Sequence, residues 1–307
     1  MAQLTVAALY HFTPLDDLAK HRDALLRVLM NHQVKGTILL APEGVNGTIA
    51  GDRSGIDAAL DAVRSLPGCQ AMEVKESRAE SQPFLRTKVR LKKEIVTMGV
   101  EGIDPSVAAG RYVRPEQWNE VISDPDTVVV DTRNDYEVGI GTFKGAVNPQ
   151  TDSFRDFPAW FDAFKDQHPG KRIAMFCTGG IRCEKSTSYA RAVGVDDVVH
   201  LKGGILKYLE HVDERDSLWE GECFVFDGRV SVRHGLELGS YDQCFACRRP
   251  IDESMKQDET YVPGVSCPQC QDEFGDDERK RFAERNRQIN LAKERGEQHL
   301  GRAPDRE

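Results

Sequence analysis

A strand-length apolar run that ends in a glycine pair and continues into a helix most constrains how this chain can fold. Residues 172–176 (RIAMF) form the apolar run, Gly179 and Gly180 follow it, and residues 184–193 have helical character. The loop 177–183 therefore lies where a buried strand ends and a helix begins. Two glycines let the backbone turn with its N–H groups pointing inward, and the helix adds its positive N-terminal end. The sequence predicts an anion-binding loop at this point.

A cysteine, Cys177, opens this loop, and Arg182 follows it five positions later. The pKa of a free thiol, about 8.5, falls at a helix N-terminus and beside an arginine, so we expect a thiolate here. Cys177 is therefore a candidate nucleophile, and Arg182 is a candidate for stabilising an anion. The simpler interpretation is a turn that happens to contain a cysteine.

The rest of the loop contributes backbone donors and a second thiol. Cys183 is either a resolving thiol for an oxidised Cys177 or simply the first residue of the helix. The other loop residues that we assign to the site are Thr178, Gly179, Gly180 and Ile181.

The 307 residues carry a formal net charge of −9, and 30% of them are charged. These values are typical of a soluble protein of two or three domains. No apolar run approaches the roughly 20 residues needed to span a bilayer, and no basic segment precedes the first apolar residues. We therefore expect a mature cytoplasmic protein with no membrane partner. The acidic balance argues against indiscriminate nucleic-acid binding, DNA included, but it allows a local basic face.

Residues 1–98 show the order βαββαβ with one additional strand, which is typical of a ferredoxin-like (acylphosphatase-like) α+β domain. The last predicted strand, 86–97, carries cations at every second position, and a period of two places them on one face. A ladder of like charges is repulsive, so a polyanion would relieve its cost, and RNA binding is our hypothesis. A solvated outer face is the alternative. The four cations are Arg86, Lys88, Arg90 and Lys92.

Glycine and proline without clear periodicity predict a linker over 99–120, whose last residues open a short helix at Pro115. Strands then alternate with helices over 121–219, with one strand expected at 145–148. This order predicts an α/β domain with a parallel sheet, whose site lies beyond the carboxyl ends of the strands. We expect Asp131 and Arg133 to form an ion pair at a strand end that positions the loops.

Two C-x2-C pairs, separated by nineteen residues, lie near the C-terminus. Each pair can present two thiolates from one turn, and two such turns complete a tetrahedron, for which zinc is the favoured ion. An iron–sulfur cluster or a redox pair is the alternative. We expect a zinc-ribbon-like segment within 220–275, where the metal replaces a core that so few residues cannot build. The four ligands are Cys244, Cys247, Cys267 and Cys270.

A charged tail, 276–307, ends the chain. Between Arg279 and Arg302 it carries eight Arg or Lys against three Glu, in a helix-favouring sequence without a clear apolar stripe. Such a segment is usually a solvated helix, and a charge-driven contact with RNA is the alternative.

Four ordered motifs make the second domain, 121–219, resemble a rhodanese domain. The spacing from Cys177 to Arg182 is C-x4-R, as in the rhodanese loop, whereas the related cysteine phosphatases have C-x5-R in a larger loop that admits phosphate. The resemblance therefore implies sulfur-centred or persulfide chemistry. The motifs are Asp131-Thr132-Arg133 with Glu137, residues 141–148, the loop 177–182 and residues 201–204.

Over nearly its whole length the chain resembles the bacterial tRNA uridine 5-hydroxylase family. The resemblance is carried by APEGVNG at 41–47, CTGGIRCEK at 177–185, GECFVFDGRV at 221–230 and the four-cysteine segment. It implies an oxidoreductase that uses molecular oxygen to form 5-hydroxyuridine at the wobble position 34 of tRNA. Cys177 is then essential, tRNA is the partner, and residues 1–98 bind RNA. No nicotinamide, flavin or haem signature is visible, and the sequence leaves the protein partners unknown.

The chemistry of oxygen activation stays open at this stage. A thiolate that adds at C6 of uridine would make C5 nucleophilic, while a cysteine persulfide or an oxidised sulfur would instead deliver oxygen. Two other classes of function also remain: a persulfide or thiosulfate sulfurtransferase, and an adaptor in which the rhodanese domain is only a scaffold.

Overall fold

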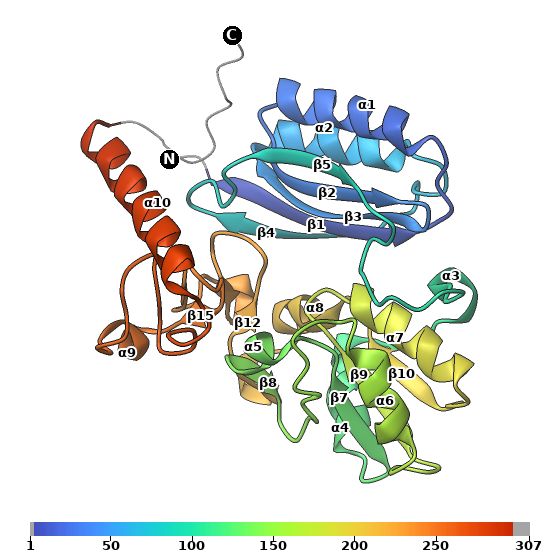
Figure 1. Cartoon of the computed structure of the whole chain (residues 1–307). Helices are drawn as coiled ribbons and strands as arrows, with labels where there is room; N and C mark the ends of the chain where they lie inside the picture. Colours follow the sequence, from blue (N-terminus) through green and yellow to red (C-terminus); the bar gives the residue numbers. More distant parts are fainter. Residues whose placement is uncertain (1–2, 297–307) are drawn as a thin grey trace.

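The computed structural model describes residues 3–296, and its N-terminal part is a five-stranded sheet with two helices on one face (Figure 1). The strand order is β4-β1-β3-β2-β5, antiparallel except for the parallel pair β2–β5. This topology confirms the predicted ferredoxin-like α+β domain. Its elements are β1 (Leu4–Phe12), α1 (Leu18–Asn31), β2 (Lys35–Ala41), β3 (Gly44–Gly51), α2 (Arg53–Arg64), β4 (Val74–Ala79) and β5 (Thr87–Leu91).

The two faces of this sheet differ in what covers them. Ile38 and Leu40 of β2 point into the hydrophobic core beneath α1 and α2. Alternation along a strand turns Thr37 and Leu39 to the opposite face, which α1 and α2 leave uncovered (Figure 1). We call this the open face of the N-terminal sheet. It is turned toward the central domain.

The basic strand is shorter than predicted, because β5 spans Thr87–Leu91 and the chain then leaves the sheet. Lys88 pairs with Thr37 and Arg90 with Leu39, so both cations lie on the open face. Arg86 and Lys92 flank the strand at its two ends. Within residues 3–296, none of the four predicted cations makes an ion pair.

The central domain is built on a parallel sheet with the order β6-β10-β9-β7, as predicted for a rhodanese-like fold. Helices lie on both of its faces (Figure 1). Its elements are α3 (Pro105–Ala108), β6 (Arg111–Val113), α4 (Pro115–Ser123), β7 (Thr127–Asp131), α5 (Asp135–Val138), β8 (Gly141–Phe143), α6 (Phe157–Lys165), β9 (Arg172–Phe176), α7 (Ile181–Ala192), β10 (Val198–Leu201) and α8 (Gly204–His211).

Two local predictions for this domain differ from the structure. The segment 99–120, predicted as a linker, contains α3, β6 and the start of α4, and β6 is an edge strand of the sheet. A strand of three residues is too short to show a period of two in the sequence. The strand predicted at 145–148 is reduced to a single bridge between Val147 and Val130.

The C-terminal part begins on the central domain and ends in a long helix. Strand β11 pairs with β8, so the start of this part is an extension of the rhodanese-like fold. None of the helices within residues 3–296 is long and apolar enough to cross a bilayer. Arg302 and the rest of the tail after residue 296 lie outside the described residues. The elements are β11 (Trp219–Gly221), β12 (Cys223–Phe224), β13 (Ser231–Val232), β14 (Asp242–Gln243), β15 (Pro250–Ile251), α9 (Glu253–Lys256) and α10 (Asp276–Glu294).

Buried polar contacts join the N-terminal sheet to the central domain. Lys185 of α7 is buried, and its ammonium group binds Glu43 at 2.8 Å and Glu94 at 2.6 Å. The hydroxyl group of Tyr10 donates to Glu184 of the same helix at 2.7 Å. Because a buried ammonium is costly unless it is paired, these contacts hold the open face against the start of α7.

Candidate active site

The loop 177–183 has the strand–loop–helix geometry that the sequence predicts. Strand β9 ends at Phe176 and helix α7 begins at Ile181. Gly180 takes a φ of 101°, which is the left-handed region that glycine tolerates best. Its N–H group donates to the sulfur of Cys177 at 3.1 Å. The cysteine therefore lies inside a ring of donors at a helix N-terminus.

Cys177 is completely buried, and burial by itself raises the pKa of a thiol. The Cys183 thiol, the positive charge of Arg182 and the N–H groups of Cys183 and Gly180 outweigh this effect and lower the pKa of Cys177 to about 5. Burial and the neighbouring thiolate raise the pKa of Cys183 well above its ordinary value. At neutral pH the loop thus holds one thiolate and one thiol that hydrogen-bonds to it.

Arg182 is tied to a carboxylate by a bidentate ion pair. Its two terminal nitrogens donate to Glu137 at 2.6 and 2.8 Å, and one of them also contacts the Thr178 hydroxyl at 3.3 Å. Burial opposes the charge of Glu137, but the guanidinium group overcomes it and keeps the pKa of Glu137 below its usual value. Arg182 therefore holds the loop to α5, and most of its charge is already balanced. Sequence reasoning placed Glu137 in a rhodanese motif without giving it a role.

The predicted ion pair between Asp131 and Arg133 is present, and both side chains are fully buried. The guanidinium group donates to Asp131 and to the carbonyl oxygen of Gly141, each at 2.6 Å. It also donates to the carbonyl oxygen of Glu137 at 3.2 Å. The pair thus fixes the backbone that carries the partner of Arg182.

A cavity of about 420 Å³ lies between the Cys177 loop and the open face of the N-terminal sheet. This size is within the ~300–1,000 Å³ range of sites for small ligands, and such sites are mostly apolar with a few polar groups. It is large enough for one small molecule. Its lining includes Cys177 from the central domain together with Thr37, Leu39, Asn46, Thr48 and Lys75 from the sheet.

Lys75 of β4 is a charged residue of this cavity that sequence reasoning missed. Burial lowers the pKa of Lys75 to about 8, although the thiolate of Cys177 favours its charged form. Its nitrogen lies 4.8 Å from the ring centre of Tyr10. It forms no ion pair within residues 3–296, so it is a cation without a carboxylate partner beside the thiolate. No motif surrounds Lys75, and 102 positions separate it from Cys177.

Glu184 and Tyr10 form a second polar pair at the edge of this site. Burial raises the pKa of Glu184, against the opposing effect of its hydrogen bonds from Tyr10 and Tyr112. Burial, together with the charge of Glu184, also raises the pKa of Tyr10 well above its usual value. The CTGGIRCEK motif contains Glu184, so the sequence held a signal for one member of this pair.

The four predicted metal ligands come together in the C-terminal part. Their sulfur atoms all lie within 4.8 Å of one another. The separations are 4.0 Å for Cys244–Cys270, 3.8 Å for Cys247–Cys267 and 3.6 Å for Cys267–Cys270. A tetrahedron with Zn–S bonds of about 2.3 Å has edges of about 3.8 Å. The positions of the four sulfur atoms therefore fit a single tetrahedral metal ion.

Comparison with family models divides the chain at places similar to the boundaries between the N-terminal and central domains. Residues 4–95 match the UPF0176 acylphosphatase like domain, and residues 114–211 match the Rhodanese-like domain. The tRNA uridine(34) hydroxylase of Gluconobacter oxydans (strain 621H) is 59% identical over 302 residues, which cover 97% of this chain and 96% of that protein. The chain belongs to the tRNA uridine(34) hydroxylase family.

A second member, the tRNA uridine(34) hydroxylase of Teredinibacter turnerae (strain ATCC 39867 / T7901), is 55% identical and covers 99% of this chain and 95% of that protein. These matches extend through the four-cysteine segment, which lies outside both matched domains. The solved rhodanese-like domain of an Anabaena protein is 16% identical, with a TM-score of 0.29 over 36% of this chain and 78% of that one, and adds nothing to the assignment.

Proposed function

We propose that this protein hydroxylates uridine 34 of tRNA at C5, with molecular oxygen as oxidant and Cys177 as the catalytic thiolate. One observation carries the proposal: a stabilised thiolate lies against a cavity of small-molecule size whose other wall is a sheet with a basic edge strand. Relatives that match nearly the full length are named tRNA uridine(34) hydroxylase. A sulfurtransferase would need the thiolate but not the basic strand. The tRNA substrate also supports the cytoplasm as the site of action.

In the proposed mechanism, the Cys177 sulfur bonds to C6 of the uridine, and the C5–C6 π electrons move toward O4 to form an enolate. C5 then bonds to one oxygen atom of O₂. The second oxygen leaves as water, with two electrons and two protons from a reductant outside the chain. Loss of the C5 proton and cleavage of the C–S bond restore the double bond and the thiolate.

Lys75 is the residue that we assign to the enolate. Arg182 is paired with Glu137, so the ammonium group of Lys75 is the cation that remains available to developing negative charge on O4. Its pKa of about 8 keeps it largely protonated at neutral pH. The role of Arg182 is then to stabilise the thiolate before substrate binds, and Cys183 supports the same thiolate through its S–H group.

The test is mass spectrometry of tRNA nucleosides from a deletion strain that carries one plasmid-borne variant at a time. We expect the wild type to restore 5-hydroxyuridine derivatives and Cys177→Ser to restore none. Cys69→Ala is the matched control, because Cys69 is a buried thiol in the core of the N-terminal domain. Equal restoration by Cys177→Ser would refute the catalytic thiolate, and unchanged nucleosides in the deletion strain would refute the function.

We also propose that the four thiolates bind one structural zinc ion. Cys244, Cys267 and Cys270 are buried and Cys247 is partly buried, so a closed site without an open position for substrate fits them best. Zinc would stabilise a segment whose strands are only two residues long.

A further inference from the structure

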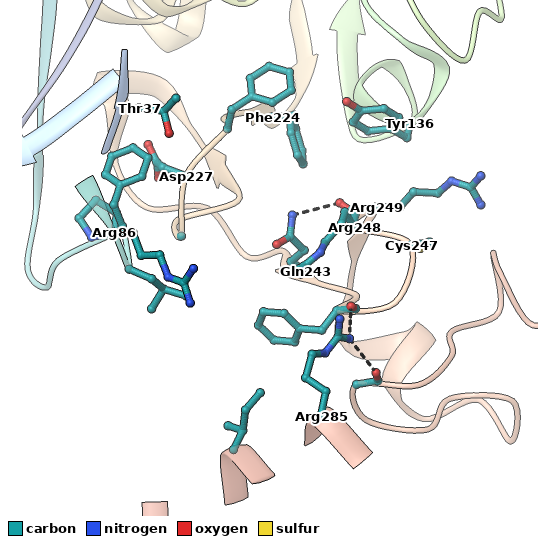
Figure 2. A pocket seen from close by; sticks show the side chains of 18 of the residues that line it. Thr37, Arg86, Tyr136, Phe224, Asp227, Gln243, Cys247, Arg248, Arg249 and Arg285 are labelled. Atoms are coloured by element: carbon teal, nitrogen blue, oxygen red, sulfur yellow. Dashed lines mark hydrogen bonds between the residues drawn. The ribbon is translucent and has the colours of Figure 1, made fainter. Parts of the chain in front are cut away.

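A wide groove adjoins the Cys177 cavity and is formed by all three parts of the chain. Its volume is about 1270 Å³, which exceeds the ~300–1,000 Å³ typical of sites for small molecules. One wall is the segment 83–88 at the basic edge of the N-terminal sheet, and Tyr136 of the central domain contributes to another. The opposite wall comes from the four-cysteine segment and helix α10 (Figure 2).

The groove is basic, although the whole chain is acidic. Six cations and three carboxylates line it. Of these carboxylates, Asp227 is already bound to Arg229, with its oxygens at 2.6 and 2.9 Å from the guanidinium nitrogens. Five of the cations make no ion pair within the described part of the chain: Arg86, Lys88, Arg248, Arg285 and Lys293. Uncompensated cations on both walls of a groove are complementary to a polyanion that lies along it.

Aromatic side chains stand between these cations. Phe226 is 59% exposed and Phe245 is 52% exposed, which is unusual for phenylalanine unless a partner covers it. Phe84 and Tyr136 also line the groove. Arg248 lies 5.5 Å from the ring centre of Phe245. Exposed aromatic rings alternating with cations are the surface on which unpaired bases stack while their phosphates are neutralised.

The backbone of the four-cysteine segment is held in place where this segment lines the groove. Phe245 lies between two of the metal ligands in the sequence, and Arg248 directly follows one of them. Arg285 of α10 donates to the carbonyl oxygens of Phe245 at 2.5 Å and Gly264 at 3.3 Å, as Figure 2 shows. The metal site and α10 therefore fix the backbone that presents the aromatic ring and the cation.

The groove and the Cys177 cavity adjoin each other, because both are lined by Thr37, Phe84, Phe226 and Asp227. We propose that the groove binds the single-stranded RNA next to the target uridine, and that the four-cysteine segment is an RNA-binding arm as well as a metal-stabilised fold. This inference rests on the proposed function. It extends the proposed function by stating where the nucleotides next to the target uridine bind and which segment of the protein binds them. An RNA strand in the groove would deliver one base into the smaller cavity.

The test is the binding of an anticodon stem-loop RNA, with uridine at position 34, to the full chain in a salt titration. Arg248→Glu should weaken binding about tenfold and reduce the salt slope by about one. Phe245→Ala should weaken binding by a similar factor with an unchanged salt slope, because stacking releases no counterions. Lys280→Glu, the same charge change on the exposed part of α10, should bind as the wild type does. Unchanged zinc content and thermal melting establish that each variant is folded.

Crosslinking locates the RNA independently of affinity. A stem-loop with 4-thiouridine next to position 34 should crosslink to peptides that contain residues 84–88 or 245–248. The groove proposal would be overturned if both groove variants bound RNA with wild-type affinity, or if crosslinks formed only elsewhere on the protein. It would also be overturned if polyglutamate bound as tightly as the RNA, which would favour an acidic protein partner. In those cases the proposed hydroxylation of tRNA by the wild-type protein would not be refuted. A wild-type protein that neither binds nor modifies tRNA would refute both proposals.

Discussion

Removing the charge of Glu137 should destabilise the central domain strongly, because it leaves the buried Arg182 guanidinium without the carboxylate that is bound to it. Glu137 is fully buried and Arg182 nearly so, and two contacts of 2.6 and 2.8 Å join them. Breaking a buried pair from one side costs about 3–5 kcal/mol. At about 4–8 °C per kcal/mol for a domain of about 100 residues, Glu137→Gln should lower the melting temperature of this domain by roughly 12–40 °C.

The reasoning also predicts the result of a double substitution. Replacing both partners by neutral residues of similar size removes the unpaired charge, so Glu137→Gln with Arg182→Met should cost less than the sum of the two single changes. Arg182→Met alone leaves a buried carboxylate, which can regain neutrality only by binding a proton.

The assay is a double-mutant cycle by calorimetry or thermal circular dichroism, with Glu116→Gln as the control for the same chemical change at an exposed position of α4. That control should shift stability by no more than about 0.5 kcal/mol. A wild-type melting temperature for Glu137→Gln, or strictly additive losses in the cycle, would show that the pair does not stabilise the loop as argued.

Three further predictions concern pH, metal and RNA. Activity on the stem-loop should rise with pH as the Cys177 thiolate forms, at about 5, and fall as Lys75 loses its proton, at about 8. Lys75→Met should lower product formation and remove the fall in activity at alkaline pH, whereas Lys20→Met should change neither. A wild-type pH profile without the alkaline fall would refute the role of Lys75. Elemental analysis should find about one zinc per chain, and chelation should lower the melting temperature; metal-free native protein would count against the site. Lys88→Glu should weaken tRNA binding with a smaller salt slope, whereas unchanged binding would discard the basic strand.

Much of the fold was predictable because its signals are local. Residues 172–176 and 198–201 are apolar runs of strand length, and both are strands in the parallel sheet. The glycine pair predicted the turn at Cys177, and the spacing of the two C-x2-C pairs predicted a cluster of four sulfurs. In each case a few consecutive residues carry the physical requirement, whether a turn, a buried strand or two thiolates from one knuckle.

Sequence-based prediction failed where an element is very short or where its role depends on a distant partner. Strand β6 has three residues and is stabilised by its hydrogen bonds to β10, so no periodicity marks it. For Arg182 the sequence predicted anion stabilisation but not its bidentate partner: the structure gives most of its hydrogen-bonding capacity to Glu137, 45 positions earlier. Competition between partners of this kind is decided by packing and not by spacing.

The sequence by itself determined the loop that carries Cys177, the α+β and α/β folds of the two domains and the cluster of four cysteines, since each depends on residues that are neighbours along the chain. Only the tertiary structure decided what surrounds the thiolate. It places Lys75 of β4 opposite Cys177, turns the open face of the N-terminal sheet into a cavity wall, and sets the exposed ring of Phe245 across a groove from Arg86. The physical reason is that side chains from separate domains meet only after each domain has buried its own apolar face and the remaining polar surfaces have paired.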